Sequence, residues 1–155
     1  MSLVFTQKPV ACVCGLFKEK ESGKSFVFAN THLDHVSEKA RELGAKVIIE
    51  EGLTAFKDYP LFLVGDFNAN PSEKAYQLLT DHLKDSRFAD GAFVYGPKGT
   101  YQAFDTTMPW EQMEEIDFIF VSKDIQVKKV GILTNTWENK FPSDHFPVEA
   151  LVELP

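Results

Sequence analysis

The sequence predicts an α+β domain in which a mixed or antiparallel sheet carries its helices on one face. Short apolar runs typical of strands recur along the chain, separated by stretches rich in Gly, Pro, Asn and Asp. Two segments, 37–52 and 75–82, instead space their apolar residues as helices do. The run at 61–64 is apolar at successive positions, as in a strand buried on both faces. These patterns indicate a sheet packed against helices.

The composition is that of an ordered globular domain. The 155 residues are 44% hydrophobic and 25% charged, with no repeats, linkers or low-complexity tracts. A chain of this length forms one domain that buries roughly 70% of the surface exposed on unfolding. The 14 Phe residues indicate thick packing against a sheet. A formal net charge of -7 argues against tight non-specific binding to a polyanion, but it allows a phosphate substrate held through a metal.

Cysteine usage and hydropathy suggest a cytoplasmic protein. Cys12 and Cys14 are two apart on an expected strand, so their side chains point the same way, which predicts buried free thiols rather than a bridge. No apolar run approaches the roughly 20 residues that span a bilayer, and no signal sequence opens the chain. We expect no membrane span. The domain is expected over residues 10–155, after a non-native or extended segment at 1–9.

The first expected elements are two strands joined as a hairpin, at 10–17 and 25–32. Alternation along the second strand places Phe26, Phe28, Asn30 and His32 on one face. An apolar stripe thus ends in an amide and an imidazole, and His32 is expected at the edge of the core.

A helix is expected next, with Ser37 as its N-cap and its end near Gly52. Arg41 falls in its first turns and can point back toward the preceding loop. A solvated helix charge is the alternative interpretation of Arg41.

The central apolar strand ends abruptly in polar residues. If the backbone stays extended beyond Gly65, the side chains of Asp66 and Asn68 project to the same side, and Gly65 allows a close approach by another group. Ser72 is expected to cap the following helix. Asp66 and Asn68 could equally satisfy only the backbone of a turn.

The region from 83 to 115 is punctuated by Gly and Pro and is expected to form loops, which could select a substrate. Thr100 lies here and is expected to help orient a site or to form a plain turn. Strands are expected at 116–121, 126–133 and 147–154. Asp117 shares a strand face with apolar residues, so burial would cost several kcal/mol, roughly 2–7, unless the carboxylate is paired. Asp117 therefore needs a partner.

Four motifs occur in a characteristic order: Thr-His-Leu-Asp-His at 31–35, Gly-Asp-Phe-Asn at 65–68, Ile-Asp-Phe-Ile at 116–119 and Ser-Asp-His at 143–145. In this order the sequence resembles the endonuclease/exonuclease/phosphatase superfamily of metal-dependent phosphoesterases. The helix with an Ala40-Arg41 pair is similar to that of compact bacterial-type members. The resemblance covers only the later part of the family's domain.

The resemblance implies a site at these strand ends. The expected catalytic residues are His32, Asp66, Asn68, Asp117 and His145, the substrate-binding residues are Asn30, Arg41 and Thr100, and the metal ligands are Asp66 and Asp144. Asp66 would accept a proton from water or hold the water in line. Asp117 would hold His145 in one tautomer and so gain the partner it needs. The oxygen ligands suit Mg²⁺ or Mn²⁺.

The family also requires an Asn on its first strand and a Glu metal ligand, and neither has a match here. We therefore expect the second half of a four-layer αββα sandwich, comprising one sheet and part of its helical cover. The predicted function is Mg²⁺-dependent hydrolysis of a phosphate ester, most simply a phosphodiester, with this chain alone inactive. The alternative is a non-catalytic module that binds a protein. Expected partners are a phosphate-ester or nucleic-acid substrate, and either a second copy of the chain or a completing N-terminal half.

Overall fold

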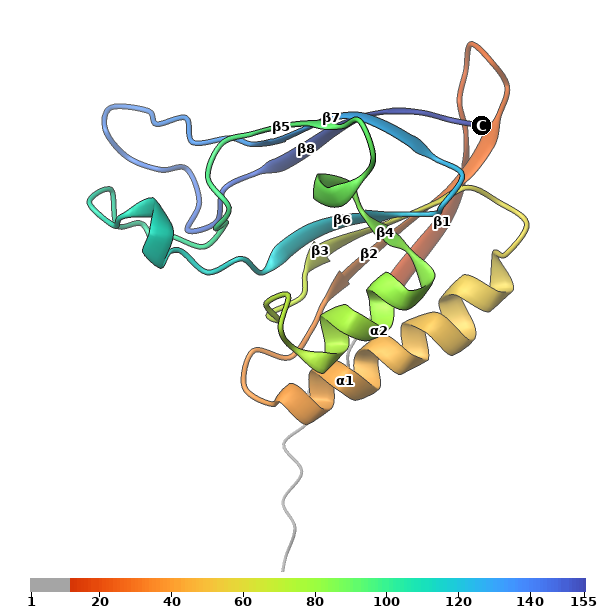
Figure 1. Ribbon diagram of the computed structural model, residues 1–155, viewed down its shortest axis with the longest axis horizontal. Coiled ribbons are helices and arrows are strands. Elements are labelled where there is room, and N and C mark those ends of the chain that lie inside the picture. The colour runs from red at the N-terminus through yellow and green to blue at the C-terminus, as the bar shows by residue number, and fades with distance from the viewer. Residues whose placement is uncertain (1–11) are drawn as a thin grey trace, which may run out of the picture.

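The computed structural model describes residues 12–155 as two sheets with the main helices on one side (Figure 1). The segment expected at 1–9 lies outside the described residues. The larger sheet contains, in spatial order, β1 (Cys12–Lys18), β2 (Ser25–His32), β3 (Leu61–Asp66), β6 (Asp117–Val121) and β4 (Lys84–Asp85). The smaller contains β5 (Phe93–Tyr95), β7 (Gln126–Ile132) and β8 (Val148–Glu153). The helical elements are α1 (Glu38–Val47), the π-helix η1 (Ile48–Leu53), α2 (Lys74–His82) and the short 3-10 helices η2 (Ser86–Phe88) and η3 (Trp110–Gln112). The predicted α+β class is confirmed.

The register of the larger sheet brings three predicted site residues into one row. β1 and β2 form the expected antiparallel hairpin, β2 and β3 run parallel, and β3 and β6 run antiparallel. His32 is opposite Asp66, and Asp66 is opposite Asp117. Strand pairing alone therefore assembles an imidazole and two carboxylates at one edge of the sheet.

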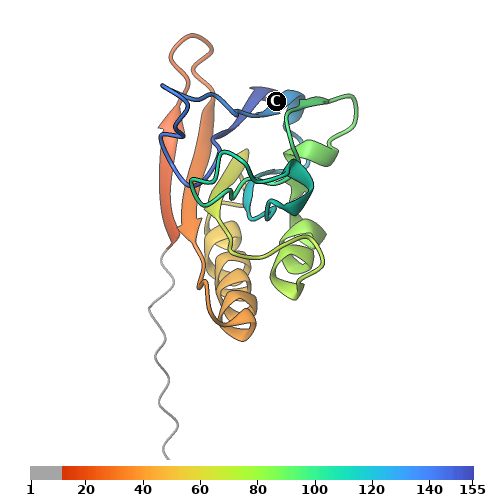
Figure 2. The same ribbon diagram turned by 90° about the vertical axis from the view of Figure 1, so that its left-hand side faces the viewer.

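α1 begins where the sequence predicts. The Ser37 side chain accepts a hydrogen bond from the backbone N–H of Ala40 at 3.2 Å, which satisfies one of the free donors of the first turn. The helix continues through η1, so its wider final turns reach past the expected end at Gly52. Figure 2 shows α1 and α2 on the same side of the larger sheet.

α2 does not begin at Ser72, which corrects the cap prediction. Glu73 occupies the N-cap position instead. The Ser72 hydroxyl and backbone N–H both donate to the side-chain oxygen of Asn70, at 2.6 and 2.9 Å. A local turn therefore uses the capping group before the helix starts.

β3 has a core on each of its faces, as its apolar run predicts. Leu63 packs with Phe118 and Phe120 beneath the two helices, in a cluster that also includes Leu79 of α2. Phe62 belongs to a second cluster, between the two sheets. None of the helices within residues 12–155 combines the length and apolar character that crossing a membrane requires.

The smaller sheet covers only part of the inner face of the larger one. The remaining space is an open trough of about 800 Å³, whose lining includes Phe26, Phe28, Phe62 and Ile119. Phe28 is 41% exposed there, whereas Val27 on the opposite face of β2 is fully buried. The Phe stripe that ends in Asn30 and His32 thus lies on the open face. The expectation of material for a single sheet is corrected, because part of the second sheet is present.

The cysteines pack as free thiols. The Sγ atoms of Cys12 and Cys14 lie 3.8 Å apart on the same side of β1. Both residues are half-buried rather than fully buried. Burial, with the nearby Cys14 thiol, raises the pKa of Cys12 to about 12.

Candidate active site

The side-by-side placement of His32 and Asp66 at the ends of β2 and β3 depends on a glycine. Gly65 has φ of 141°, and a Cβ at this position would overlap the carbonyl oxygen of Thr31 in the neighbouring strand. The group predicted to approach Gly65 is therefore backbone of β2. This close packing sets His32 beside Asp66, with His32 Nε2 3.2 Å from Asp66 Oδ2.

The predicted Asp117–His145 hydrogen bond is present. His145 Nδ1 lies 2.7 Å from Asp117 Oδ2, and His145 Nε2 lies 4.0 Å from Asp66 Oδ2. The Asp66 carboxylate thus has an imidazole on each side, from His32 and His145. The bond to Asp117 leaves Nε2 of His145 as the nitrogen available to a substrate.

Burial and the neighbouring charges together shift the pKa values of Asp66 and His145. Burial raises the pKa of Asp66 and the charge of Asp117 raises it further, while the backbone N–H of Asn68 and the two histidines act in the opposite direction. For His145, burial opposes the charged form, but the hydrogen bond to Asp117 and the charges of Asp117 and Asp66 outweigh it, so the pKa is raised. Both groups consequently hold a proton more readily than when free in solution.

Asn68 contacts the site with a backbone conformation that differs from the expected extended one. Its φ is 48°, in the left-handed region, so the backbone does not stay extended after Asp66. The Asn68 backbone N–H donates to Asp66 Oδ1 at 2.8 Å, and its side-chain amide donates to the carbonyl oxygen of Leu33 at 3.0 Å. Asn68 therefore fixes the Asp66 carboxylate and ties the end of β3 to the chain leaving β2. Asn30 is exposed on the trough side of β2.

Thr100 lies behind the site. It has no exposed surface, which is inconsistent with direct contact to a substrate. Its hydroxyl accepts hydrogen bonds from the backbone N–H groups of Asp117 at 3.1 Å and Ile116 at 3.3 Å. Its carbonyl oxygen accepts from the N–H of Phe146 at 2.7 Å. Thr100 thus joins the two segments that carry Asp117 and His145, a positioning role.

Arg41 is committed to a structural ion pair, which corrects the expectation that it reaches a substrate. Its Nε and Nη2 donate to Glu73 Oε2 at 2.9 and 2.5 Å, and its Nη1 donates to the carbonyl oxygen of Asp34 at 3.1 Å. Only 10% of the Arg41 side chain is exposed. The guanidinium joins α1 to the start of α2 instead of facing the site.

Among the described residues 12–155, one group of side chains has the geometry to hold a cation. A ligand atom from each of Asp66, Asp117 and His145 lies within 4.8 Å of the others. Two carboxylates that face each other repel, and a divalent cation with oxygen ligands would relieve that repulsion, so the donor set fits such an ion. Asp144 stands outside this group; its carbonyl oxygen accepts from the N–H groups of Gln102 and Ala103 at 3.0 and 3.2 Å.

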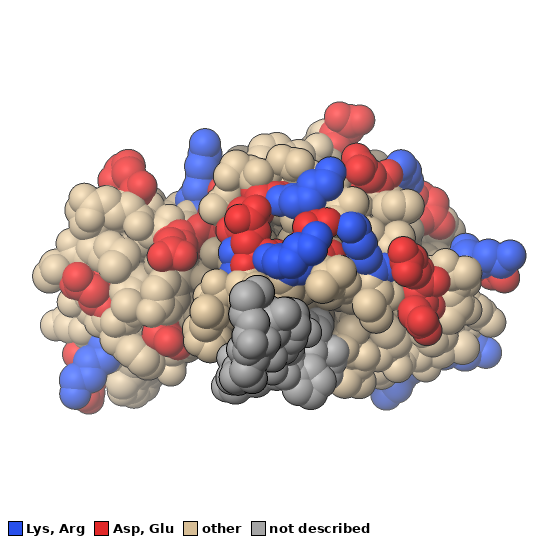
Figure 3. All heavy atoms as spheres, turned by 90° about the horizontal axis from the view of Figure 1, so that it is seen from below, with Lys and Arg blue, Asp and Glu red and all other residues tan. Residues whose placement is uncertain are grey.

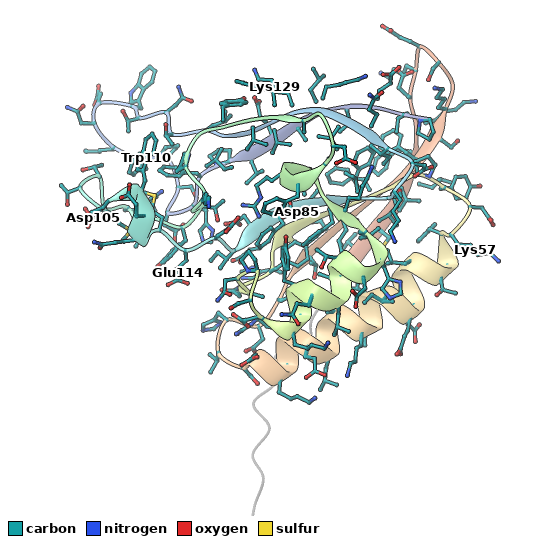
Figure 4. The ribbon with its side chains drawn as sticks, viewed as in Figure 1. Lys57, Asp85, Asp105, Trp110, Glu114 and Lys129 are labelled. Atoms are coloured by element: carbon teal, nitrogen blue, oxygen red, sulfur yellow. The ribbon has the colours of Figure 1, made fainter. Side chains whose placement is uncertain are left out.

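Sequence reasoning missed the residues that support β6 and His145. Arg87 bonds to Asp85 and Glu115, lies 4.3 Å over the Phe118 ring and forms a buried network beside the strand. The Tyr101 ring lies 4.9 Å from the His145 ring. In Figure 4, Asp85 lies on β4, whereas Asp105 and Trp110, the first residue of η3, lie in the segment that projects beyond the sheet edge. Arg87 is distant in sequence from every motif, so no local pattern marks it.

This layered fold, with carboxylates and histidines gathered at strand ends, is that of the phosphoesterase superfamily. The chain belongs to the Endonuclease/Exonuclease/phosphatase family, whose profile matches residues 5–145.

Similar proteins include several of bacterial origin. A functionally unknown conserved protein of Enterococcus faecalis V583 has 44% identity and a TM-score of 0.87, over 93% of this chain and 56% of that one. The mannosyl-6-phosphatase Bt3783 of Bacteroides thetaiotaomicron has 34% identity and a TM-score of 0.84, over 92% and 57%. Nocturnin of Drosophila melanogaster is 29% identical over 96% of this chain and 28% of its own length. The chain therefore spans little more than half of these solved structures and less of Nocturnin.

Proposed function

We propose that the protein acts in the hydrolysis of a phosphate ester, assisted by Mg²⁺ or Mn²⁺. The observation that carries this proposal is the position of the Asp66 carboxylate, 3.2 Å from His32 Nε2 and 4.0 Å from His145 Nε2, with His145 bonded to Asp117. Hydrolysis of a phosphate ester needs a base for water and donors for the phosphoryl oxygens, and this arrangement supplies both.

Each side chain has a defined part in this proposal. Asp66 holds the attacking water and accepts its proton, for which its raised pKa is favourable. Protonated His145 donates from Nε2 to a phosphoryl oxygen, and Asp117 holds its ring through Nδ1. His32 contacts the phosphate or the leaving group, and Asn30 orients His32. Asn68 keeps the Asp66 carboxylate in place.

Asp66 and Asp117 are the carboxylates best placed to hold the cation. Asp144, which directly precedes His145 in the sequence, is proposed as a further oxygen ligand. A divalent cation there would neutralise charge that develops on the phosphoryl oxygens. The resident ion is proposed as Mg²⁺ or Mn²⁺, because oxygen ligands predominate.

A sugar phosphate is the substrate we propose to test first. The 34% identity to a mannosyl-6-phosphatase favours this substrate over nucleic acid. Charge supports the same choice, since the net charge is -7 and lysine and arginine lie among aspartate and glutamate on the face formed by the helices (Figure 3). A phosphodiester is the second substrate to test, because the order of the motifs at the strand ends led to that prediction from the sequence.

We further propose that residues 10–155 correspond to the second half of a complete catalytic domain. The chain spans 56% of one relative and 57% of another, and the trough exposes apolar side chains that a sandwich would cover. A completing half would also supply the missing Glu and Asn. The chain by itself should therefore bind a cation weakly and show almost no turnover.

The test is cation binding followed by site mapping. Mn²⁺ titrated into the ¹⁵N-labelled chain should broaden the amide signals around Asp66, Asp117 and His145. In Asp66→Asn this binding of Mn²⁺ should be lost. Cys12→Ser, which alters a thiol on another strand, is the control and should bind like the wild type. Broadening centred on the cysteines, or unchanged binding in Asp66→Asn, would contradict the proposal.

A further inference from the structure

A buried ionic network lies against β6. Arg87, on η2, has a side chain that is only 6% exposed. Its Nη2 lies 3.1 Å from Asp85 Oδ2, and its Nη1 lies 2.6 Å from Glu115 Oε1. Buried ion clusters of this kind are costly to desolvate and are often no more stabilising than apolar side chains of similar size. Stability alone therefore does not account for the network, whereas fixed positions for the segments that it joins would.

One side of the network is anchored on β4, β6 and α2. Asp85 belongs to β4 and pairs with Phe120 of β6. The Tyr76 hydroxyl, from α2, donates to Asp85 Oδ2 at 2.9 Å. The Arg87 guanidinium lies 4.3 Å over the ring of Phe118. These contacts hold the guanidinium against the sheet and α2.

The other side of the network reaches the two segments that meet at Asp117. Glu115 precedes Asp117 by two residues, and Arg87 Nη1 also donates to the carbonyl oxygen of Lys98 at 3.4 Å. Lys98 precedes Thr100 by two residues, and the Thr100 hydroxyl accepts from the N–H of Asp117 at 3.1 Å. One guanidinium therefore bonds to both of the segments that Thr100 joins.

Asp117 is a residue whose position depends on the chain before it. It is the first residue of β6, and residues 115 and 116 belong to no strand or helix. Its carboxylate must nevertheless meet the ring of His145, with Oδ2 2.7 Å from Nδ1. Hydrogen bonds weaken steeply as their geometry departs from the optimum, so a displaced Asp117 would release the ring.

We infer that Arg87 is a positioning residue that sets the place of Asp117 and, through it, the orientation of the His145 ring. It does so through its bonds to the Glu115 carboxylate and the Lys98 carbonyl oxygen. The inference rests on the proposed function, in which Asp117 and His145 act at the phosphate. Lysine would not replace Arg87, because an ammonium lacks the planar fork of donors that bonds to several partners in fixed directions.

The experiment compares two substitutions of Glu115 in the 155-residue chain. Both remove the same charge, but Glu115→Gln keeps an oxygen that accepts from Arg87, whereas Glu115→Ala removes the contact. Arg87 and Asp85 stay paired in each, so both variants should fold.

The ring tautomer of His145 is the first measurement, made by ¹⁵N NMR without metal at pH 9. The wild type and Glu115→Gln should show the Nδ1–H tautomer that donates to Asp117, and Glu115→Ala should show a mixture with the Nε2–H tautomer. Mn²⁺ titration is the second. Glu115→Ala should bind Mn²⁺ about tenfold more weakly than Glu115→Gln, the lower end of the range for residues that hold a metal site in place.

Two further variants separate position from charge and stability. Arg87→Lys keeps the positive charge and removes the fork, so it should change the His145 tautomer in the same direction, even if Glu115→Ala does not fold. Glu73→Ala is the matched control, because Glu73 also pairs with a buried arginine and is 17% exposed, compared with 20% for Glu115. It should lower the free energy of unfolding, measured with denaturant, without changing the tautomer.

Three outcomes would overturn the inference: a wild-type tautomer in Glu115→Ala or in Arg87→Lys, equal changes in Glu115→Ala and Glu115→Gln, or an equal change in Glu73→Ala. The second would mean that charge alone acts, and the third that any loosening of the fold releases the ring. If Mn²⁺ does not bind the wild-type chain near Asp66 and Asp117, the proposed function fails. The tautomer comparison, made without metal, still decides whether Arg87 positions Asp117.

Discussion

His145 Nδ1 and Asp117 Oδ2 lie 2.7 Å apart, so a carboxylate from the start of β6 orients an imidazole from a loop 28 residues further along the chain. The two segments meet because Thr100 bonds to the backbone of both. This contact gives Asp117 the partner that a half-buried acid on an apolar strand requires.

Asp117→Asn should lower the pKa of His145, because it removes the carboxylate charge that raises it and leaves only a neutral, weaker hydrogen-bond acceptor for Nδ1. A raised folded-state pKa means that charged His145 stabilises the fold below its unfolded pKa of about 6.5, and that this stabilisation is lost as pH rises through the folded pKa. The variant should therefore lose stability at pH 6, by up to about 2 kcal/mol, and lose less at pH 9.

Histidine NMR titration and denaturant unfolding at both pH values measure these effects. Asp90→Asn, an exposed acid in another loop, is the control. An unchanged His145 titration in Asp117→Asn would mean that the pair does not set the protonation of the ring.

Asp66→Asn should stabilise the protein at neutral pH while removing cation binding. Burial and Asp117 raise the pKa of Asp66, so its ionised form is destabilising in the folded state. For a carboxyl with a raised pKa, the favourable contribution exists below its unfolded value, about 3.9, and is lost as pH rises through the folded value. We expect the free energy of unfolding at pH 7 to rise by about 0.5–2 kcal/mol, as for other single stabilising substitutions. Chemical unfolding at pH 7 without metal measures it, and a loss of stability would refute the electrostatic argument.

Arg41→Ala should destabilise the fold without affecting phosphate binding. The variant leaves Glu73, whose side chain is 17% exposed, without its cation, and breaking such a buried pair costs about 3 kcal/mol. Thermal unfolding measures the loss of stability, and an NMR titration of the chain with inorganic phosphate measures phosphate binding. Lys39→Ala removes an exposed partner of Glu42 on the same helix and should change stability by less than about 1 kcal/mol. A stable Arg41→Ala chain that no longer binds phosphate would restore the substrate-binding role.

The isolated chain should self-associate through the trough, most simply as a symmetric dimer, because contiguous apolar surface of this kind normally lies in an interface. Phe28→Asp places a charge on this face at a residue already 41% exposed, so the dimer should dissociate while the monomer stays folded. Sedimentation velocity across a dilution series measures this, with Phe88→Asp as the control. A wild-type chain that remains monomeric at high concentration would contradict the interface.

The sequence by itself determined the elements and the chemistry at their ends. Alternation and capping residues located the hairpin, the start of α1 and the strand before Asp66, because these signals are local. The need of Asp117 for a partner could also be read from one strand, since an acid among apolar neighbours is costly wherever that strand packs.

Only the tertiary structure decided which side chains face the site. Thr100 is buried behind the site, where it bonds to the backbone of the segments that carry Asp117 and His145. Arg41 is paired with Glu73, and the Asn68 side chain is tied to Leu33. Each of these partners is distant in sequence. The Phe stripe of β2 faces an open trough, since periodicity defines a face but not what covers it. The hydrogen bonds that join Gln102 to Ser143 and Asp144 exist only in the folded chain, because hydrogen bonds between distant segments leave no periodic pattern in the sequence.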